Sequence, residues 1–178
     1  MVDLAEIQAA YYMVAATGVL VAAAFYIVNV RITLETRRIG LLQNISTNIA
    51  NEEGQKRLFE LMSYEWTDYE DFEKKYGTKT NISSAAKRYD IWTSFNTIGM
   101  MVRKGLVKVD DVYNMGIAGV PDLWVKYRPI IEEIRRRYAG GEYCRDLEFL
   151  AGEMMRHVQS KDPSWRMPGN LSDYVSNR

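Results

Sequence analysis

The chain has 178 residues, of which 47% are apolar and 12% aromatic, and its 23 basic residues balance 23 acidic ones. This composition excludes a disordered chain, and the zero net charge provides no field that would attract nucleic acid, so no nucleic-acid partner is expected. Cys144 is the only cysteine, which excludes an intramolecular disulfide and a zinc site with two or more thiolates.

The first predicted element is a helix long and apolar enough to cross a membrane. No charged residue occurs from Ile7 to Val30, and such a helix extends for about 36 Å, more than the roughly 30 Å hydrocarbon core of a bilayer. The alternative is a cleaved signal peptide, but Asp3 and Glu6 stand where a signal carries positive charge. We therefore predict a transmembrane anchor over residues 1–30, with the lipid bilayer as a partner.

Basic residues mark only one end of this helix. Arg31, Arg37 and Arg38 follow it, whereas no Lys or Arg precedes it. Because the more basic flank of a membrane helix stays in the cytoplasm, the sequence predicts a single-pass protein of the cell membrane. Its N-terminus would lie outside and its C-terminal domain in the cytoplasm.

One face of the predicted membrane helix carries small residues. Ala15, Gly18 and Ala22 recur at spacings of three and four, and small side chains let another helix approach closely. This face would suit packing against other membrane-protein subunits or self-association. The alternative is that alanine is frequent here only because it is a good helix former.

The apolar pattern continues beyond the membrane segment and predicts a helical stalk over residues 31–52. The stripe recurs at spacings of three, three and four, at Ile39, Leu42, Ile45 and Ile49. It must be covered by the following domain or by a second copy in a coiled coil. Gly54 is the expected interruption of the helix.

Residues 53–160 are predicted to form a small helical bundle, the cytoplasmic domain. The expected helices cover residues 56–63, 67–76, 83–104, 110–115, 121–138 and 142–160. Thr67 and Glu70 fit a capping box, and Pro129 either kinks its helix or starts a new one. No stretch alternates with period two, so the fold class is all-α without a sheet. Residues 161–178 form a flexible tail unless Trp165 docks.

The two clearest soluble helices have well-defined inward faces. The helix over 83–104 repeats apolar residues at spacings of four, three and four, at Ile91, Phe95, Ile98 and Val102. The helix over 142–160 is expected to bury Leu147, Leu150, Ala151 and Met154. These two helices should therefore supply much of the core.

No group of residues supports a catalytic, cofactor or metal site. His157 follows Glu153 by four residues, and Glu148 follows Cys144 by the same step, but two pairs on one helix do not surround an ion. The carboxylates between residues 52 and 73 resemble a solvated acidic surface, and no phosphate loop or hydrolase elbow occurs. We therefore predict no catalytic residue, no metal and no cofactor.

The run of arginines at residues 135–137 is predicted to be a salt-bridged surface. Glu132 precedes Arg136 by four residues, and Glu133 precedes Arg137 by the same step. This is the favourable order for ion pairs along a helix.

Three stretches together resemble a known family. They are EWTDYEDF at residues 65–72, FNTIGMMVRKGLV at 95–107 and WVKYRPII at 124–131, followed by Arg135. Over roughly Ile7 to Met155 the chain resembles the prokaryotic family labelled domain of unknown function 4760. The resemblance implies a transmembrane anchor followed by a helical domain, and it implies no activity. Asn96 stands where the family is expected to carry an acidic residue.

The large side chains of these stretches are candidate anchors of the core or of a partner. Trp92, Phe95 and Trp124 can each bury about 150 to 250 Å², and Arg128 and Arg135 accompany them in the motif. The sequence as a whole favours a non-catalytic, membrane-anchored interaction protein, a subunit or adaptor of a membrane complex. The alternative is an enzyme of unrecognised type with a polar cleft in the helical domain.

Overall fold

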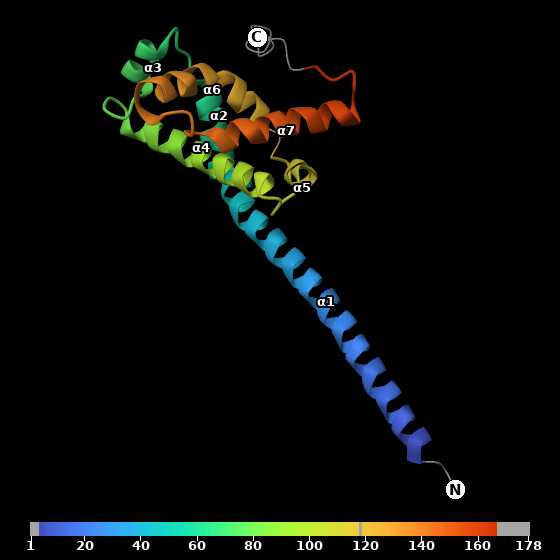
Figure 1. Cartoon of the computed structure of the whole chain (residues 1–178). Coiled ribbons are helices and arrows are strands. Elements are labelled where there is room, and N and C mark those ends of the chain that lie inside the picture. Colours follow the sequence, from blue (N-terminus) through green and yellow to red (C-terminus); the bar gives the residue numbers. More distant parts are fainter. Residues whose placement is uncertain (1–3, 118, 167–178) are drawn as a thin grey trace. The chain divides into compact units, whose positions relative to one another are not determined.

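The computed structural model describes residues 4–117 and 119–166, and within these ranges the protein is all-helical without a strand. The fold class predicted from the sequence is therefore confirmed. The chain divides into two compact units, Met1–Gly40 and Leu41–Arg178. Figure 1 shows that helices α2 to α7 all belong to the second unit.

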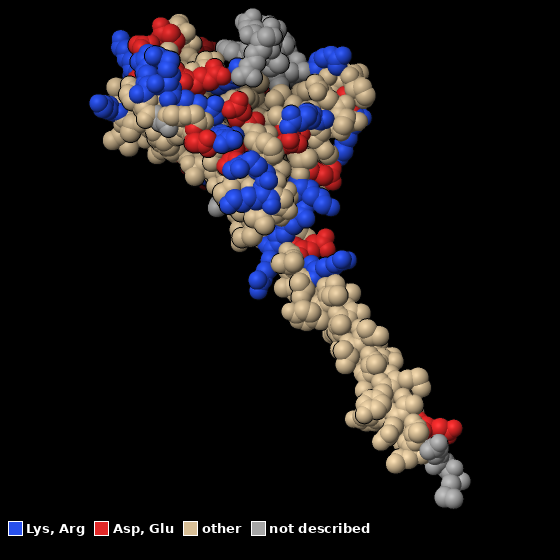
Figure 2. All heavy atoms as spheres, viewed as in Figure 1, with Lys and Arg blue, Asp and Glu red and all other residues tan. Residues whose placement is uncertain are grey.

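Helix α1 (Leu4–Ala50) contains the predicted membrane segment. Its residues from Leu4 to Arg37 are all exposed. Among the described residues it is the one helix long and apolar enough to cross a membrane, and Figure 2 shows its charge-free surface as an unbroken tan stretch. Because such a surface is unfavourable in water, α1 is a candidate membrane span.

The last turns of α1 belong to the core of the second unit. Leu42 and Ile49 are each 3% exposed, so the domain itself covers this part of the predicted stalk. Ile39, in the first unit, is exposed. The side chain of Ile45 lies outside the described residues.

The chain breaks at Asn51 and not at Gly54, so the predicted interruption is wrong. Asn51 caps helix α2 (Glu52–Ser63), because its side-chain oxygen accepts a hydrogen bond from Gly54 N–H at 2.7 Å. Asparagine is among the strongest N-cap residues. Gly54 therefore lies inside the first turn of the new helix.

Helix α3 (Tyr69–Tyr76) starts with a cap one residue later than predicted. Asp68 Oδ1 accepts from Asp71 N–H at 2.8 Å, and Asp71 Oδ2 accepts from Thr67 N–H at 3.1 Å. The predicted pairing of Thr67 with Glu70 is wrong, because aspartate is the stronger cap of the two candidates.

The remaining helices lie where the sequence pattern predicted them, with ends that differ by a few residues. They are α4 (Ile82–Arg103), α5 (Val109–Asn114), α6 (Val120–Ile134) and α7 (Arg145–Lys161), with a π-helical turn at Arg135–Ala139. Pro129 lies within α6 and does not start a new segment. Gly105 has a φ of +68° and ends α4 as predicted.

Aromatic side chains from three helices form the centre of the second unit. Phe72 of α3, Trp92 and Phe95 of α4, and Tyr127 of α6 are each at most 1% exposed. The Trp92 and Tyr127 rings meet edge to face with centroids 5.3 Å apart. The inward face predicted for α7 is confirmed, because its buried residues are Leu147, Leu150, Ala151 and Met154.

Helices α4 and α7 pack closely along one another (Figure 1). A Cβ atom on Gly99 would lie 1.9 Å from the carbonyl oxygen of Asp146, so only glycine fits this contact. One turn earlier, Asn96 Oδ1 accepts hydrogen bonds from Asp146 N–H and Leu147 N–H, both at 3.1 Å. The N-cap residue of α7, Cys144, makes no side-chain cap bond. The N-terminus of α7 is therefore capped by a side chain of α4, and not by the residue that precedes α7.

The predicted tail is described only in part. Lys161 ends α7, and residues 162–166 continue from it. Residues 167–178, the rest of the predicted flexible tail, lie outside the described residues.

Candidate functional site

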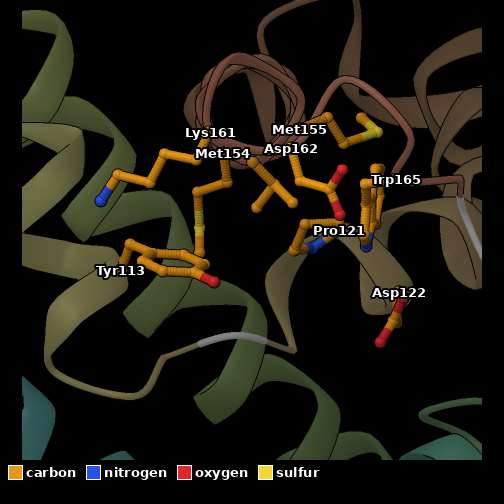
Figure 3. Close-up of a pocket in the computed structure, with 9 residues that line it drawn as sticks. Tyr113, Pro121, Asp122, Met154, Met155, Lys161, Asp162 and Trp165 are labelled. Atoms are coloured by element: carbon orange, nitrogen blue, oxygen red, sulfur yellow. The ribbon is translucent and has the colours of Figure 1, made fainter.

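A hollow of about 370 Å³ lies in the second unit between α5, α6, α7 and the residues that follow α7. We call it the Trp165 pocket, and its lining residues are Tyr113, Pro121, Asp122, Met154, Met155, Val158, Lys161, Asp162 and Trp165. Figure 3 shows Tyr113 and Lys161 on one side of it and Trp165 and Asp122 on the other. Most of the lining is apolar, with three charged groups among it.

A tight turn after α7 brings Trp165 to the pocket. The Asp162 carboxylate accepts a hydrogen bond from Ser164 N–H at 2.9 Å. The backbone of Asp162 accepts from Trp165 N–H at 3.0 Å. These bonds fold the chain back, so the Trp165 indole is part of the lining and is only partly exposed.

The loop between α5 and α6 sets the position of Asp122. Gly116 has a φ of +76°, a conformation that favours glycine, and Pro121 lies in the first turn of α6, where its missing N–H costs nothing. Asp122 is therefore in the first turn as well. From the other side α7 contributes Met154, which is 1% exposed.

Asp122 is an acidic side chain without a partner. Its carboxylate has no hydrogen bond and no ion pair with any residue that the structure describes, and burial raises its pKa above the usual value. Lys126, one turn further along α6, would be its natural ion-pair partner. Lys126 instead donates to Met62 O at 2.6 Å and lies over the Trp66 ring. The pocket thus contains a negative charge that the fold leaves uncompensated.

Lys161, the basic residue of the lining, is already neutralised. Its Nζ donates to Asp110 Oδ1 at 2.9 Å and lies 5.3 Å from the centroid of the Tyr113 ring. The same Asp110 oxygen lies 3.3 Å from His157 Nε2. Lys161 chiefly, and then His157, lower the pKa of Asp110. An acidic ligand would therefore have to displace an existing pair.

No family model, curated protein or solved structure matches this chain. The side chains of the pocket themselves indicate what it can bind. An apolar hollow with one unpaired carboxylate is suited to binding an apolar group that carries a positive charge. Among the described residues, no three His, Cys, Asp or Glu side chains are placed to hold a metal ion.

The aromatic residues predicted as anchors lie in the core and not at this pocket. Trp92, Phe95 and Trp124 are 1%, 0% and 5% exposed, and none of them lines the pocket. Phe95 also borders a second, smaller hollow of about 210 Å³ that Phe59 and Ile117 share.

Of the two arginines of the motif, Arg128 pairs within α6, and Arg135 joins the end of α6 to α7. Arg128 Nε donates to Glu132 at 2.7 Å. Arg135 donates to Tyr143 O at 2.7 Å and to Glu148 at 2.9 Å, and its guanidinium lies 5.7 Å from the Trp124 ring centroid.

The predicted pairing of the arginine run is partly wrong. Arg137 contacts Glu133 as predicted, but Arg136 also contacts Glu133, since Glu132 is occupied by Arg128. The two arginines lower the pKa of Glu133 to about 2.

The small-residue face of α1 has no neighbour within the first unit. Ala15, Gly18 and Ala22 are exposed, and a Cβ atom on Gly18 would meet nothing within 4 Å. The pocket, by contrast, was not foreseen from the sequence. Its one visible signal was Trp165, a large aromatic residue in a polar, proline-containing segment.

Proposed function

We propose that this chain is a non-catalytic, single-pass protein of the cell membrane that acts as a subunit or adaptor of a membrane complex. Its N-terminus lies outside and its helical domain lies in the cytoplasm, where the domain holds a protein partner. The chain also belongs, in this proposal, to the family labelled domain of unknown function 4760.

The surface of α1 is the observation that carries the proposal. From Ile7 to Val30 it is uncharged and exposed on every face. A helix of this kind is stable only with lipid or other helices around it. Arg31, Arg37 and Arg38 then favour a cytoplasmic domain.

The character of the Trp165 pocket supports binding over catalysis. An enzyme that uses general acid or base chemistry needs converging polar groups of suitable pKa. Asp122 has a raised pKa, which favours an enzyme as the second candidate function. However, Lys161 is held by Asp110 and Asp162 by Ser164, so neither is available as a second reacting group.

The subunit proposal is tested by the mass of the intact chain extracted from native membranes in mild detergent. We expect a complex larger than the monomer, measured by light scattering on a sizing column. Gly18→Leu should reduce its amount if the small face is the seam. Ala16→Leu, about 160° around the helix from Gly18, is the matched control. A chain that elutes as a lone monomer contradicts the proposal.

A further inference from the structure

We propose that the Trp165 pocket receives an arginine side chain of the protein partner, with the guanidinium on Asp122 and the aliphatic stem along the methionines. This inference rests on the proposed function, since it identifies the chemistry of the partner that the domain holds. The site lies outside the three sequence motifs at residues 65–72, 95–107 and 124–131.

The charge of the pocket selects a cation. Asp122 has no partner among the described residues, while Lys126 is turned away to Met62 O and Trp66. A second carboxylate, Asp162, also lines the hollow. Lys161, the cation in the lining, is paired with Asp110. Arg166 donates to the backbone oxygens of Pro163 and Trp165. A phosphate or carboxylate ligand would meet two negative groups here.

The walls of the pocket select a cation on an apolar stem. Met154, Met155 and Val158 come from two successive turns of α7 and offer an adaptable apolar surface. A hollow of about 370 Å³ is near the lower end of the range for small-ligand sites, roughly 300 to 1,000 Å³. The hollow therefore has room for one long side chain.

Arginine suits this lining better than lysine does. Its planar guanidinium binds a carboxylate through two parallel hydrogen bonds and also stacks on aromatic faces. Both kinds of group are present, as Asp122 and Trp165 lie on the same side of the hollow in Figure 3. Guanidinium is also less strongly hydrated than ammonium, which lowers the cost of entering an apolar site.

The test uses two small probes that differ in charge. The full-length chain in detergent micelles, with ¹³C-methyl methionine, is titrated with N-propylguanidinium and separately with its neutral isostere N-propylurea. Met154→Leu and Met155→Leu assign the two methyl signals. We expect saturable shifts of both signals, with the guanidinium bound at least tenfold more tightly than the urea.

Asp122→Asn is the decisive variant. It keeps the shape of the side chain and removes the charge, so the preference for guanidinium over urea should fall to within about twofold. Glu52→Gln, which removes an exposed carboxylate on α2, is the control and should leave the preference unchanged. Unaltered methionine spectra without probe show that both variants are folded.

Three results would overturn the inference. They are equal binding of the two probes, an Asp122→Asn variant that keeps the preference, and the absence of shifts at Met154 and Met155. Tighter binding of N-butylammonium than of N-propylguanidinium would overturn the choice of arginine.

The inference and the proposed function fail separately. If the chain from native membranes is a lone monomer but the charge-dependent shifts occur, the subunit proposal is wrong and the pocket assignment stands. If a complex survives extraction and the probes do not bind, the pocket assignment alone is wrong.

Discussion

The cap that α4 supplies to α7 yields the sharpest prediction about stability. Asn96 Oδ1 accepts the N–H groups of Asp146 and Leu147 at 3.1 Å each, and these are the second and third residues of α7. Those are the amides that an N-cap side chain normally satisfies. Asn96→Ala leaves both of them without an acceptor, while Cys144 provides no substitute.

The expected cost follows from measured caps. Loss of an N-cap side chain destabilises a protein by about 0.5 to 2 kcal/mol, and the Asn96 contacts are partly buried, so we expect about 1 to 2 kcal/mol. Asn96→Asp keeps the acceptor and adds a negative charge at the positive end of the helix dipole, which contributes about 0.3 to 1 kcal/mol. Asp146 does not oppose this charge strongly, because Arg103 holds it at 2.5 Å.

Urea unfolding of the micelle-bound chain, followed by tryptophan fluorescence, measures these differences, since Trp92 and Trp124 are buried in the same domain. Thr93→Ala, at an exposed position of α4, is the control and should change stability by less than about 0.5 kcal/mol. If Asn96→Ala is as stable as the parent, or if Asn96→Asp is as unstable as Asn96→Ala, Asn96 does not cap α7.

Three further predictions concern single side chains. Tyr127→Phe removes the donor to Leu61 O at 2.7 Å in the core and should cost about 1 to 3 kcal/mol in the same unfolding assay; no change would show that the bond is unimportant. Burial raises the pKa of Cys144 from 9.0 to about 11. N-ethylmaleimide at pH 8 should therefore modify this thiol about 100-fold more slowly in the folded chain than in the unfolded one. Mass spectrometry measures both rates, and equal rates would contradict the burial of the thiol. Because the pKa of Asp122 is higher in the folded than in the unfolded chain, its charge lowers stability as pH rises through that interval, and the loss persists at higher pH. Asp122→Asn should therefore be more stable than the parent at pH 7 and equal to it well below the unfolded aspartate pKa of about 3.9. Urea titration measures both; a variant less stable at pH 7 would show that the carboxylate has a partner.

Regular periodicity and local turn chemistry could be predicted from the sequence. The uncharged stretch predicted α1, and apolar spacings of four, three and four predicted α4. The inward face of α7 was predicted residue by residue. Gly105 ended its helix because a positive φ favours glycine over any other residue. These features depend on residues close together in the chain.

Features that depend on distant residues could not be predicted. The capping of α7 by Asn96 joins residues 50 positions apart. The Trp165 pocket likewise requires three helices and a returning chain. The missing partner of Asp122 could not be predicted either, because Lys126, one turn away, contacts Met62 and Trp66 instead.

The embedding of α1 in a bilayer can be tested directly. Washing native membranes with alkaline sodium carbonate removes proteins that are held only at the surface, while a helix that spans the hydrocarbon core is retained. We predict that the intact chain stays with the sedimented membranes after this wash. Recovery of the intact chain in the supernatant would contradict the membrane anchor.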